Sequence, residues 1–158
     1  MNISVRYAKR EDLARINELR KMVNDLHAEN RPDIFRPGFC EKIQEHVYQV
    51  FEAQESDVVV ACIDGVVCGF SMVEYIDKPQ SAYQLARHFY QIQEFGVDSA
   101  FRRCGVATAL IDFCRSEAKR MHFDCMELDA WAFNEGAIQF YESVGFQTYR
   151  RYMESKIE

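Results

Sequence analysis

The fold follows from one stretch of the sequence, Gln91-Ile-Gln-Glu-Phe-Gly-Val-Asp-Ser-Ala-Phe-Arg-Arg-Cys-Gly-Val-Ala-Thr-Ala-Leu-Ile111. Its first part, to Val97, has the length and apolar content of a strand, whereas the part from Val106 onward has helical spacing. A strand that leads through a tight turn into a helix points unpaired backbone N–H groups and the positive end of the helix dipole at one place. This arrangement predicts a phosphate or pyrophosphate site. The turn adds two cationic side chains and a glycine: Arg102, Arg103 and Gly105.

The residues of the turn exclude two common classes of phosphate-binding site. The turn lacks the Gly-Lys-Ser/Thr of a nucleotide-hydrolysing P-loop and the Gly-x-Gly-x-x-Gly of a dinucleotide site. It contains Arg102-x-x-Gly105-x-Ala107, and a later stretch reads Trp131-Ala-Phe-Asn134-Glu-Gly-Ala137-Ile-Gln-Phe-Tyr141-Glu-Ser-Val-Gly145-Phe146. Together and in this order, the two stretches resemble the motifs of the GNAT superfamily, the N-acetyltransferases that use acetyl-coenzyme A (acetyl-CoA).

The resemblance covers essentially the whole chain. It implies an α/β (α+β) fold class, the GNAT fold, with a mixed and mostly antiparallel central sheet flanked by about four helices. Residues 1–158 would then form one acetyltransferase domain, and this length suits a single domain with a sizeable core.

The apolar patterns predict the elements in chain order. Residues 81–87 are left open between a short helix and a loop. The predicted elements are a strand at 3–7, a helix from near 10 that ends before His27, a second helix marked by 39–51, a hairpin of 58–63 and 66–76 around Asp64-Gly65, a strand at 88–97, a helix at 106–121, a strand at 125–131, a helix at 135–144 capped by Gly145, and last strands at Phe146 and 150–157.

Composition limits the partners and the compartment. Hydrophobic residues make up 48% of the chain, no apolar run is long enough to span a bilayer, and the N-terminus does not look like a signal peptide, so we expect a cytoplasmic protein without a membrane partner. The net charge of −6 argues against nucleic acid as the main partner. A homodimer is left open.

The acidic excess is concentrated in the middle of the chain. Residues 41–98 hold three Lys/Arg and ten Asp/Glu, whereas both flanking parts are nearly balanced. If this segment borders the acceptor site, it would favour a cationic amine. A solvated acidic helix face is an equally good interpretation.

The six cysteines contain no C-x-x-C pair and no partnering histidine cluster, so neither a metal site nor a disulfide framework is predicted. Around the Asp64-Gly65 turn, position 62 should face 67 and position 61 should face 68, which would place Cys62 and Cys68 on opposite faces. We therefore expect free thiols. Cys104 lies at a helix N-terminus, where a reactive thiol is chemically reasonable, but a small packing residue is the more common role.

The GNAT resemblance also implies the cofactor-binding residues. In this superfamily the strand before the turn carries a bulge whose backbone binds pantetheine and the acetyl carbonyl. Here that region is Phe95-Gly96-Val97, with the Val97 N–H as oxyanion donor, and a glycine within a strand independently suggests a bulge. The implied acetyl-CoA ligands are Phe95, Gly96, Val97, Arg102, Arg103, Cys104, Gly105, Val106, Ala107, Thr108, Asn134, Ala137 and Tyr141.

Two catalytic residues are predicted. Acetyl transfer needs a neutral amine, a stabilised oxyanion and a proton for the leaving thiolate. The resemblance implies that Tyr141 donates that proton. Glu94 lies on the expected central strand, where a desolvated carboxylate would be a stronger base, acting directly or through water. Related polyamine acetyltransferases carry two acids here, whereas this chain has Gln93-Glu94, and Glu74 or Asp129 could serve instead.

These observations predict an acetyl-CoA-dependent N-acetyltransferase that acts by direct attack of a primary amine, without a metal. The expected acceptor is a small molecule that is polyamine-like, aminoalkyl or an antibiotic. A protein N-terminal or lysine acetyltransferase, which needs an open groove, remains an alternative. The loop Arg31-Pro-Asp-Ile-Phe-Arg36 resembles the segment that borders the acceptor pocket in small-molecule GNAT enzymes, and it would narrow such a groove. His27 could act on substrate, but a surface or helix-end histidine is the more common role. A non-catalytic CoA-binding module is a further alternative.

Overall fold

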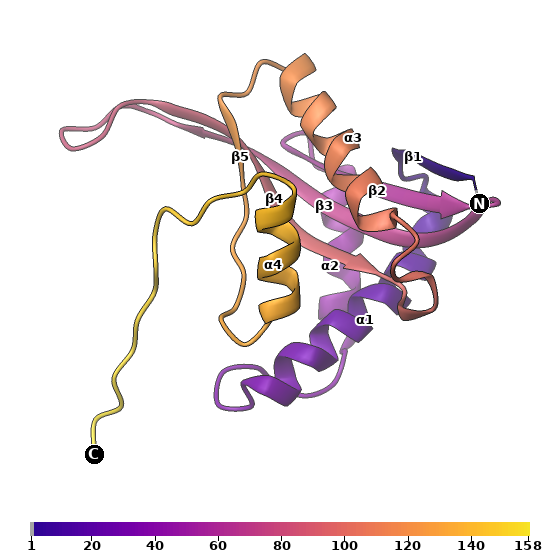
Figure 1. Ribbon diagram of the computed structural model, residues 1–158, viewed down its shortest axis with the longest axis horizontal. Helices are drawn as coiled ribbons and strands as arrows, with labels where there is room; N and C mark the ends of the chain where they lie inside the picture. The colour runs from indigo at the N-terminus through magenta and orange to yellow at the C-terminus, as the bar shows by residue number, and fades with distance from the viewer. Residues whose placement is uncertain (1) are drawn as a thin grey trace.

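The computed structural model describes residues 2–158 and forms three layers, with a central sheet covered by helices on both faces (Figure 1). Helices α1 and α2 lie on one face, and α3 and α4 on the other. The elements are β1 (Ile3–Tyr7), α1 (Leu13–Asn30), α2 (Glu41–Glu52), β2 (Ser56–Ile63), β3 (Val66–Lys78), β4 (Arg87–Val97), α3 (Val106–Arg120), β5 (Cys125–Glu127) and α4 (Glu135–Ser143), with short 3-10 turns at Arg10–Asp12 and Ser99–Phe101.

The sheet has five strands in the order β1-β2-β3-β4-β5. All pairs are antiparallel except β4 with β5, which are parallel and joined through α3. Strand β5 pairs with β4 only over Phe89 to Gln91, so the two strands separate where β4 continues toward Val97. This mixed α+β architecture confirms the predicted fold class.

Two apolar layers hold the sheet between its helices. On one face, Leu13, Ile16 and Leu19 of α1 and Val47 of α2 pack on Phe70 and Met72 of β3. On the other face, α3 packs on β1 to β4, and its central residues are fully buried. Burying large aliphatic and aromatic side chains contributes about 1.5–3 kcal/mol each, so these layers fix the sheet that carries the site.

Several predicted boundaries were wrong. Helix α1 does not end before His27 but continues to Asn30, because the first residue that cannot donate a helical hydrogen bond is Pro32. The predicted strand at 125–131 is ordered as a strand only over Cys125–Glu127. Of the open segment 81–87, residues 81–86 are a loop and Arg87 begins β4. In this loop, which joins the two long strands of the β3–β4 hairpin, the Ser81 N–H donates to the Gln84 carbonyl at 3.0 Å.

The cysteine predictions were largely confirmed. All six thiols are free. Cys62 pairs with Val67 as expected, but Ala61 pairs with Gly69 rather than Cys68, because Cys68 is the extra residue of a bulge. Cys62 and Cys68 nevertheless pack in the layers on opposite faces of the sheet.

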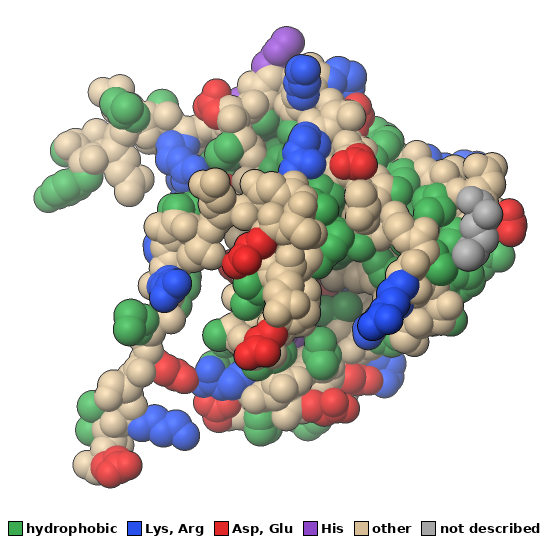
Figure 2. Space-filling model, in the orientation of Figure 1, with side chains coloured by type: hydrophobic (Ala, Val, Ile, Leu, Met, Phe, Trp, Pro, Cys, Tyr) green, Lys and Arg blue, Asp and Glu red, His purple; other side chains and the backbone are tan. Residues whose placement is uncertain are grey.

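The last predicted strands are absent. Residues 147–158 contain no helix or strand, all of them are exposed, and the chain extends away from the body after α4 (Figures 1 and 2). The strand prediction was therefore wrong for the single chain.

Candidate active site

The turn between β4 and α3 has the geometry of an anion site. The carboxylate of Asp98 fixes its start by accepting hydrogen bonds from the Ala100 N–H at 3.0 Å and from Arg15 at 2.6 Å. Both hydrogen bonds hold the pKa of Asp98 below its usual range, and the one from the Ala100 N–H contributes most. The turn then passes through left-handed backbone at Arg103 (φ 62°) and Gly105 (φ 85°), which glycine adopts without steric cost.

The first backbone N–H groups of α3 are left without helical acceptors. The first α3 hydrogen bond is donated by Ala109 to the Gly105 carbonyl at 3.0 Å. The N–H groups of Val106, Ala107 and Thr108 therefore point out of the helix end, toward the same side as its positive dipole. Arg102 and Arg103 are exposed beside them, and neither forms an ion pair within residues 2–158.

Strand β4 contains a bulge, but at Gln93 rather than at Gly96. Met72 pairs with Glu94 and Val73 with Ile92, so Gln93 is the extra residue, and the register from Glu94 to Val97 is regular. Side chains along a strand point alternately to the two faces of the sheet. One extra residue therefore moves every side chain after it to the opposite face from the one it would otherwise occupy. Ile92 packs on the α3 side, and Phe95, three residues later, packs there too.

Gly96 is required for close packing instead. A Cβ at this position would lie 2.8 Å from Cε1 of Phe70 and 3.0 Å from Cγ2 of Val23. The glycine therefore lets α1 and the Phe70 ring approach the strand.

The backbone N–H group of Val97 points into the opening between β4 and β5. In antiparallel pairs, opposite residues alternately exchange both hydrogen bonds or neither. The Asp98 N–H donates to the Cys68 carbonyl at 2.8 Å, so the opposite residues Val97 and Gly69 exchange no hydrogen bonds with each other. The Val97 N–H consequently faces away from β3, and the alternation directs the Phe95 N–H the same way. Strand β5 has already separated from β4 at this level.

Tyr141 lies over this part of β4. Its ring meets Phe95 edge to face, with centroids 6.0 Å apart, and it also contacts Phe146 at 5.8 Å. Desolvation, with a smaller contribution from the charge of Asp129, raises the pKa of Tyr141 to about 12. The phenol therefore keeps its proton at neutral pH, as a general acid must.

Asn134 and Ala137 form the beginning of α4. The Asn134 Oδ1 accepts a hydrogen bond from the Ala137 N–H at 3.3 Å, which is a helix N-cap. The cap holds the start of the helix that carries Tyr141. The predicted contacts of Asn134 and Ala137 with the cofactor stay predictions.

Glu94 is not the free, desolvated carboxylate that the sequence suggested. Its two oxygens accept hydrogen bonds from Nε and Nη2 of Arg20 at 2.9 and 3.0 Å, a bidentate ion pair. The Arg20 side chain is 3% exposed and that of Glu94 is 29% exposed. Glu94 therefore points toward α1, whereas Phe95 and Tyr141 lie on the other face of β4. This geometry favours a structural role for Glu94.

Arg20 was not among the site residues predicted from the sequence, although the sequence contained a signal for it. The residue lies four positions after Ile16 and three before Val23, which is the spacing of the apolar stripe of α1. An arginine on such a stripe turns inward and needs an acceptor. Besides Glu94, it donates to the Ile43 carbonyl at 2.8 Å and to Asn17 at 2.9 Å.

Of the two other carboxylates that were considered, Asp129 is the better placed. It is exposed and has no hydrogen-bond or ion-pair partner among residues 2–158, and its negative charge contributes to the raised pKa of Tyr141. Glu74 instead accepts a hydrogen bond from Nε2 of Gln93 at 2.6 Å.

An aromatic cluster joins the loop after α1 to the loop before α4. The ring of His27 lies 5.1 Å from that of Phe35 and 5.8 Å from that of Phe133, and Phe35 meets Trp131 edge to face at 5.0 Å. The Arg31 guanidinium lies 5.9 Å from the Trp131 ring centre. His27 is thus a helix-end histidine, in the last turn of α1, and a half-buried member of this cluster. The loop that follows α1 is closed against the loop before α4.

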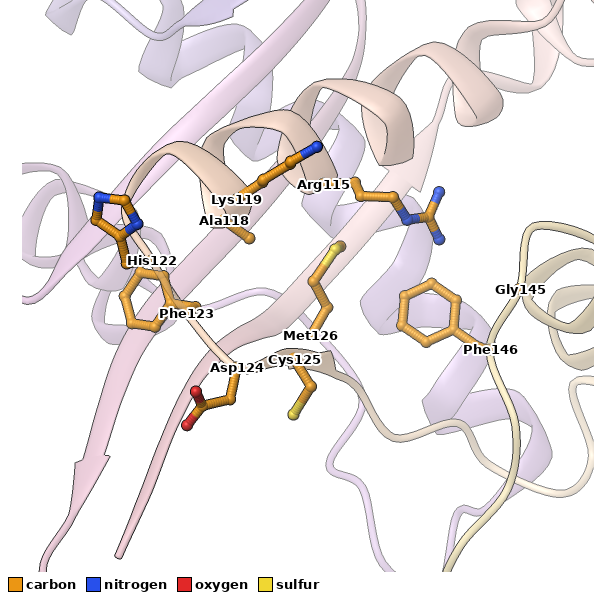
Figure 3. A pocket seen from close by; sticks show the side chains of 10 residues that line it. All are labelled: Arg115, Ala118, Lys119, His122, Phe123, Asp124, Cys125, Met126, Gly145 and Phe146. Atoms are coloured by element: carbon orange, nitrogen blue, oxygen red, sulfur yellow. The ribbon is translucent and has the colours of Figure 1, made fainter.

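A hollow of about 590 Å³ lies between α3 and β5, away from the turn at Arg102 (Figure 3). Met126 of β5 and Phe146, which follows α4, border it, and Arg115 reaches toward Phe146 from α3. None of the residues that line this hollow belongs to the turn after β4, to the end of β4 or to Tyr141.

Comparison with known proteins decides the family. The sequence profile of the Acetyltransferase (GNAT) family matches residues 17–146. The chain belongs to the GNAT acetyltransferase family. It is accordingly an acetyl-CoA-dependent N-acetyltransferase, as the sequence predicted.

Relatives and solved structures agree with this family. The L-amino acid N-acetyltransferase AaaT of Escherichia coli (strain K12) is 27% identical, over 92% of this chain and 83% of that protein. A tetramutant of the BH1408 protein from Bacillus halodurans is 25% identical, with a TM-score of 0.92 over 98% of this chain and 99% of that chain. The aminoglycoside N-acetyltransferase AAC(6')-Iy in complex with CoA shares the fold, with 18% identity and a TM-score of 0.75 over 99% and 95% of the two chains.

Residues 2–158 contain no group of three His, Cys, Asp or Glu side chains arranged to hold a metal ion. Over the same residues, no helix is both long and apolar enough to cross a membrane.

Proposed function

We propose that this GNAT enzyme acetylates the primary amine of a small cationic molecule by direct attack on acetyl-CoA. The observation that carries the proposal is a convergence along one side of β4. There the unpaired N–H groups of α3, the outward N–H of Val97 and the hydroxyl-bearing ring of Tyr141 surround the opening between β4 and β5. The opening thus offers a cradle for a pyrophosphate, a donor for an oxyanion and an acid.

The closed aromatic cluster supports a small acceptor over a protein substrate. A peptide would need an open groove between the loop after α1 and the loop before α4. Phe35 and Trp131 are in contact across that position. The relatives act on small amines by name, namely an amino acid and aminoglycosides. Aromatic faces near an acceptor also favour cations.

In this proposal each group of the site has a separate role in the reaction. The α3 N-terminus and Arg102 hold the diphosphate of acetyl-CoA, which supplies the activated acetyl group. The Val97 N–H donates to the carbonyl oxygen as negative charge develops on it, and such a donor is worth several kcal/mol of the barrier. Tyr141 gives its proton to the sulfur that leaves.

We assign the carboxylate that receives the proton of the amine to Asp129 rather than Glu94. Asp129 is exposed, and its negative charge contributes to the raised pKa of Tyr141. Glu94 is already paired with a buried arginine. The acidic excess of residues 41–98 has no part in this assignment: Asp129 lies outside that segment, and Glu52, Glu94 and Asp98 within it pair with arginines of the first 20 residues.

The substrate class is tested by measuring CoA thiol release from acetyl-CoA with matched sets of acceptors. We expect turnover with an amino acid, an aminoglycoside or a polyamine, and a KM for a cationic acceptor that rises with salt because screening weakens its attraction to Asp129. Turnover with peptides alone, or with a neutral acceptor without salt dependence, would overturn the proposed class.

The Asp129→Asn variant tests the base. General base catalysis typically contributes roughly 10²–10⁴-fold, so turnover with the best acceptor should fall by about that factor while CoA affinity is unchanged. The matched control, Glu94→Gln, leaves the buried Arg20 without a carboxylate and should cost about 1–3 kcal/mol of stability with much of the turnover retained. The reverse pattern, with turnover lost in folded Glu94→Gln and kept in Asp129→Asn, would make Glu94 the base.

A further inference from the structure

Gly69 of β3 lies where three parts of the candidate site meet: the end of β4, the turn that follows it and the start of α3. Gly69 is the residue opposite Val97, the last residue of β4. Opposite residues that exchange no hydrogen bonds have Cα atoms only about 4.5 Å apart. The carbonyl of the preceding Cys68 accepts the hydrogen bond from the Asp98 N–H, at the start of the turn. One short piece of β3 therefore holds both the end of β4 and the beginning of the turn.

The start of α3 packs directly on the bare face of Gly69. A Cβ built on Gly69 would lie 2.9 Å from Cγ1 of Val106 and 3.0 Å from Cδ1 of Leu110. Val106 is the first residue of α3, and Leu110 lies one turn later. Because ordinary contacts between carbon atoms begin near 3.5 Å, the glycine lets α3 lie roughly half an ångström closer to β3 than any other residue would allow.

Neither side of this contact can adjust by a side-chain rotation alone. Val106 is 1% exposed, and a valine has essentially one χ1 rotamer in a helix. Strand β3 is hydrogen-bonded to a strand on each side, and on its other face Phe70 is fully buried in the layer beneath α1. A methyl group added at Gly69 would therefore move the start of α3 outward, since β3 has no room to retreat.

We propose that Gly69 is a positioning residue that sets the distance between the two ends of the acetyl-CoA site. This inference rests on the cofactor arrangement of the proposed function. At one end the Val97 N–H meets the acetyl carbonyl, and at the other the first N–H groups of α3 meet the diphosphate. The pantetheine arm links these two parts of the cofactor, and linked groups bind together only when the span between their sites matches the linker. Gly69 keeps the helix end and the strand end at that span.

The first test measures binding without an amine, by calorimetry for CoA and by NMR titration for ADP, which carries a diphosphate but no pantetheine arm. The parent protein should bind both. Gly69→Ala should bind CoA roughly tenfold more weakly, because part of the gain from two linked contacts is lost. Its affinity for ADP should be unchanged, since the N–H groups of α3 move as one unit with Arg102. An unchanged affinity for CoA, or an equal loss for both ligands, overturns the inference.

The second test compares two acetyl donors with the same amine: acetyl-CoA and S-acetylpantetheine, which lacks the diphosphate. A displacement of 1 Å at a reacting centre can cost about 10²-fold in rate, so roughly half of that displacement should lower the turnover of acetyl-CoA by about tenfold in Gly69→Ala. S-acetylpantetheine is not held at the turn, so its turnover should be unchanged. A general packing defect would lower both rates equally, and that result overturns the inference.

The matched control is Gly136→Ala in α4. A Cβ added there has no neighbour within 4 Å among residues 2–158, its own helix turn aside. This variant makes the same chemical change without displacing an element. It should behave like the parent protein with both ligands and with both donors.

Two double variants identify the contact that carries the effect. Gly69→Ala/Val106→Ala removes the closest atom at the start of α3, and it should regain CoA affinity relative to Gly69→Ala. Gly69→Ala/Leu110→Ala keeps that contact and should remain impaired relative to Leu110→Ala. The second double variant also replaces Gly69→Ala if the single variant does not fold, because it relieves one of the two close contacts. Recovery through Leu110→Ala alone overturns the role of the helix start.

The parent protein separates this inference from the proposed function. If it binds CoA but not ADP, or uses the two donors equally well, the turn does not hold the diphosphate, and both the proposed cradle and the role of Gly69 fail. If the parent protein binds both ligands and prefers acetyl-CoA, while folded Gly69→Ala matches it in every measurement, only the role of Gly69 fails.

Discussion

Replacing Tyr141 with phenylalanine should lower turnover by roughly 10²–10⁴-fold, the usual contribution of a general acid. The substitution keeps the ring that meets Phe95 and Phe146 and removes only the hydroxyl. Because the ring packing is unchanged, CoA affinity and thermal stability should change little. The loss should therefore appear in kcat, which steady-state kinetics with the best acceptor will measure.

Two features make this result specific to proton donation. The loss should shrink with an acetyl donor whose thiol is more acidic, since a better leaving group needs less help. The pKa of Tyr141, raised to about 12, means that the phenol is protonated throughout the neutral range, so the rate should not titrate with this group below about pH 10. Tyr83→Phe, which removes a hydroxyl from a fully exposed loop, is the control. Equal turnover of Tyr141→Phe and the parent would reduce Tyr141 to a packing residue.

Reversing the charge at Arg102 should weaken CoA binding by roughly 10²–10³-fold. A hydrogen bond to a charged group contributes about 1.5–3 kcal/mol, and a glutamate would add repulsion toward the diphosphate. Arg102 is exposed and forms no ion pair within residues 2–158, so the fold should be unaffected. Calorimetric titration with CoA measures the affinity, and circular dichroism checks the fold.

A matched charge reversal separates the local effect from net charge. Lys42 is exposed in the first turn of α2, on the opposite face of the sheet, and Lys42→Glu changes the net charge equally. This variant should bind CoA like the parent. If Arg102→Glu binds CoA with unchanged affinity, the diphosphate is held elsewhere.

The sequence alone determined the family, the fold class and the element that carries the cofactor turn. Strand, glycine turn and helix are local features, and the spacing from Val97 to Ala107 is set by which residues can adopt the turn and begin a helix. Helix α4 is also set by local features, because asparagine is favoured at a helix N-cap, as at Asn134, and glycine at a helix end, as at Gly145.

Tertiary structure decided what these elements face. The extra residue at Gln93 reversed the side-chain alternation of β4, and only the pairing with β3 reveals which residue is extra. That reversal directs Glu94 to Arg20 and leaves Phe95 beneath Tyr141, which separates the two predicted catalytic residues onto opposite faces. Likewise, the strand pattern of residues 150–157 is a real local preference, but a strand requires a partner edge, and the single chain does not bring one within hydrogen-bonding distance.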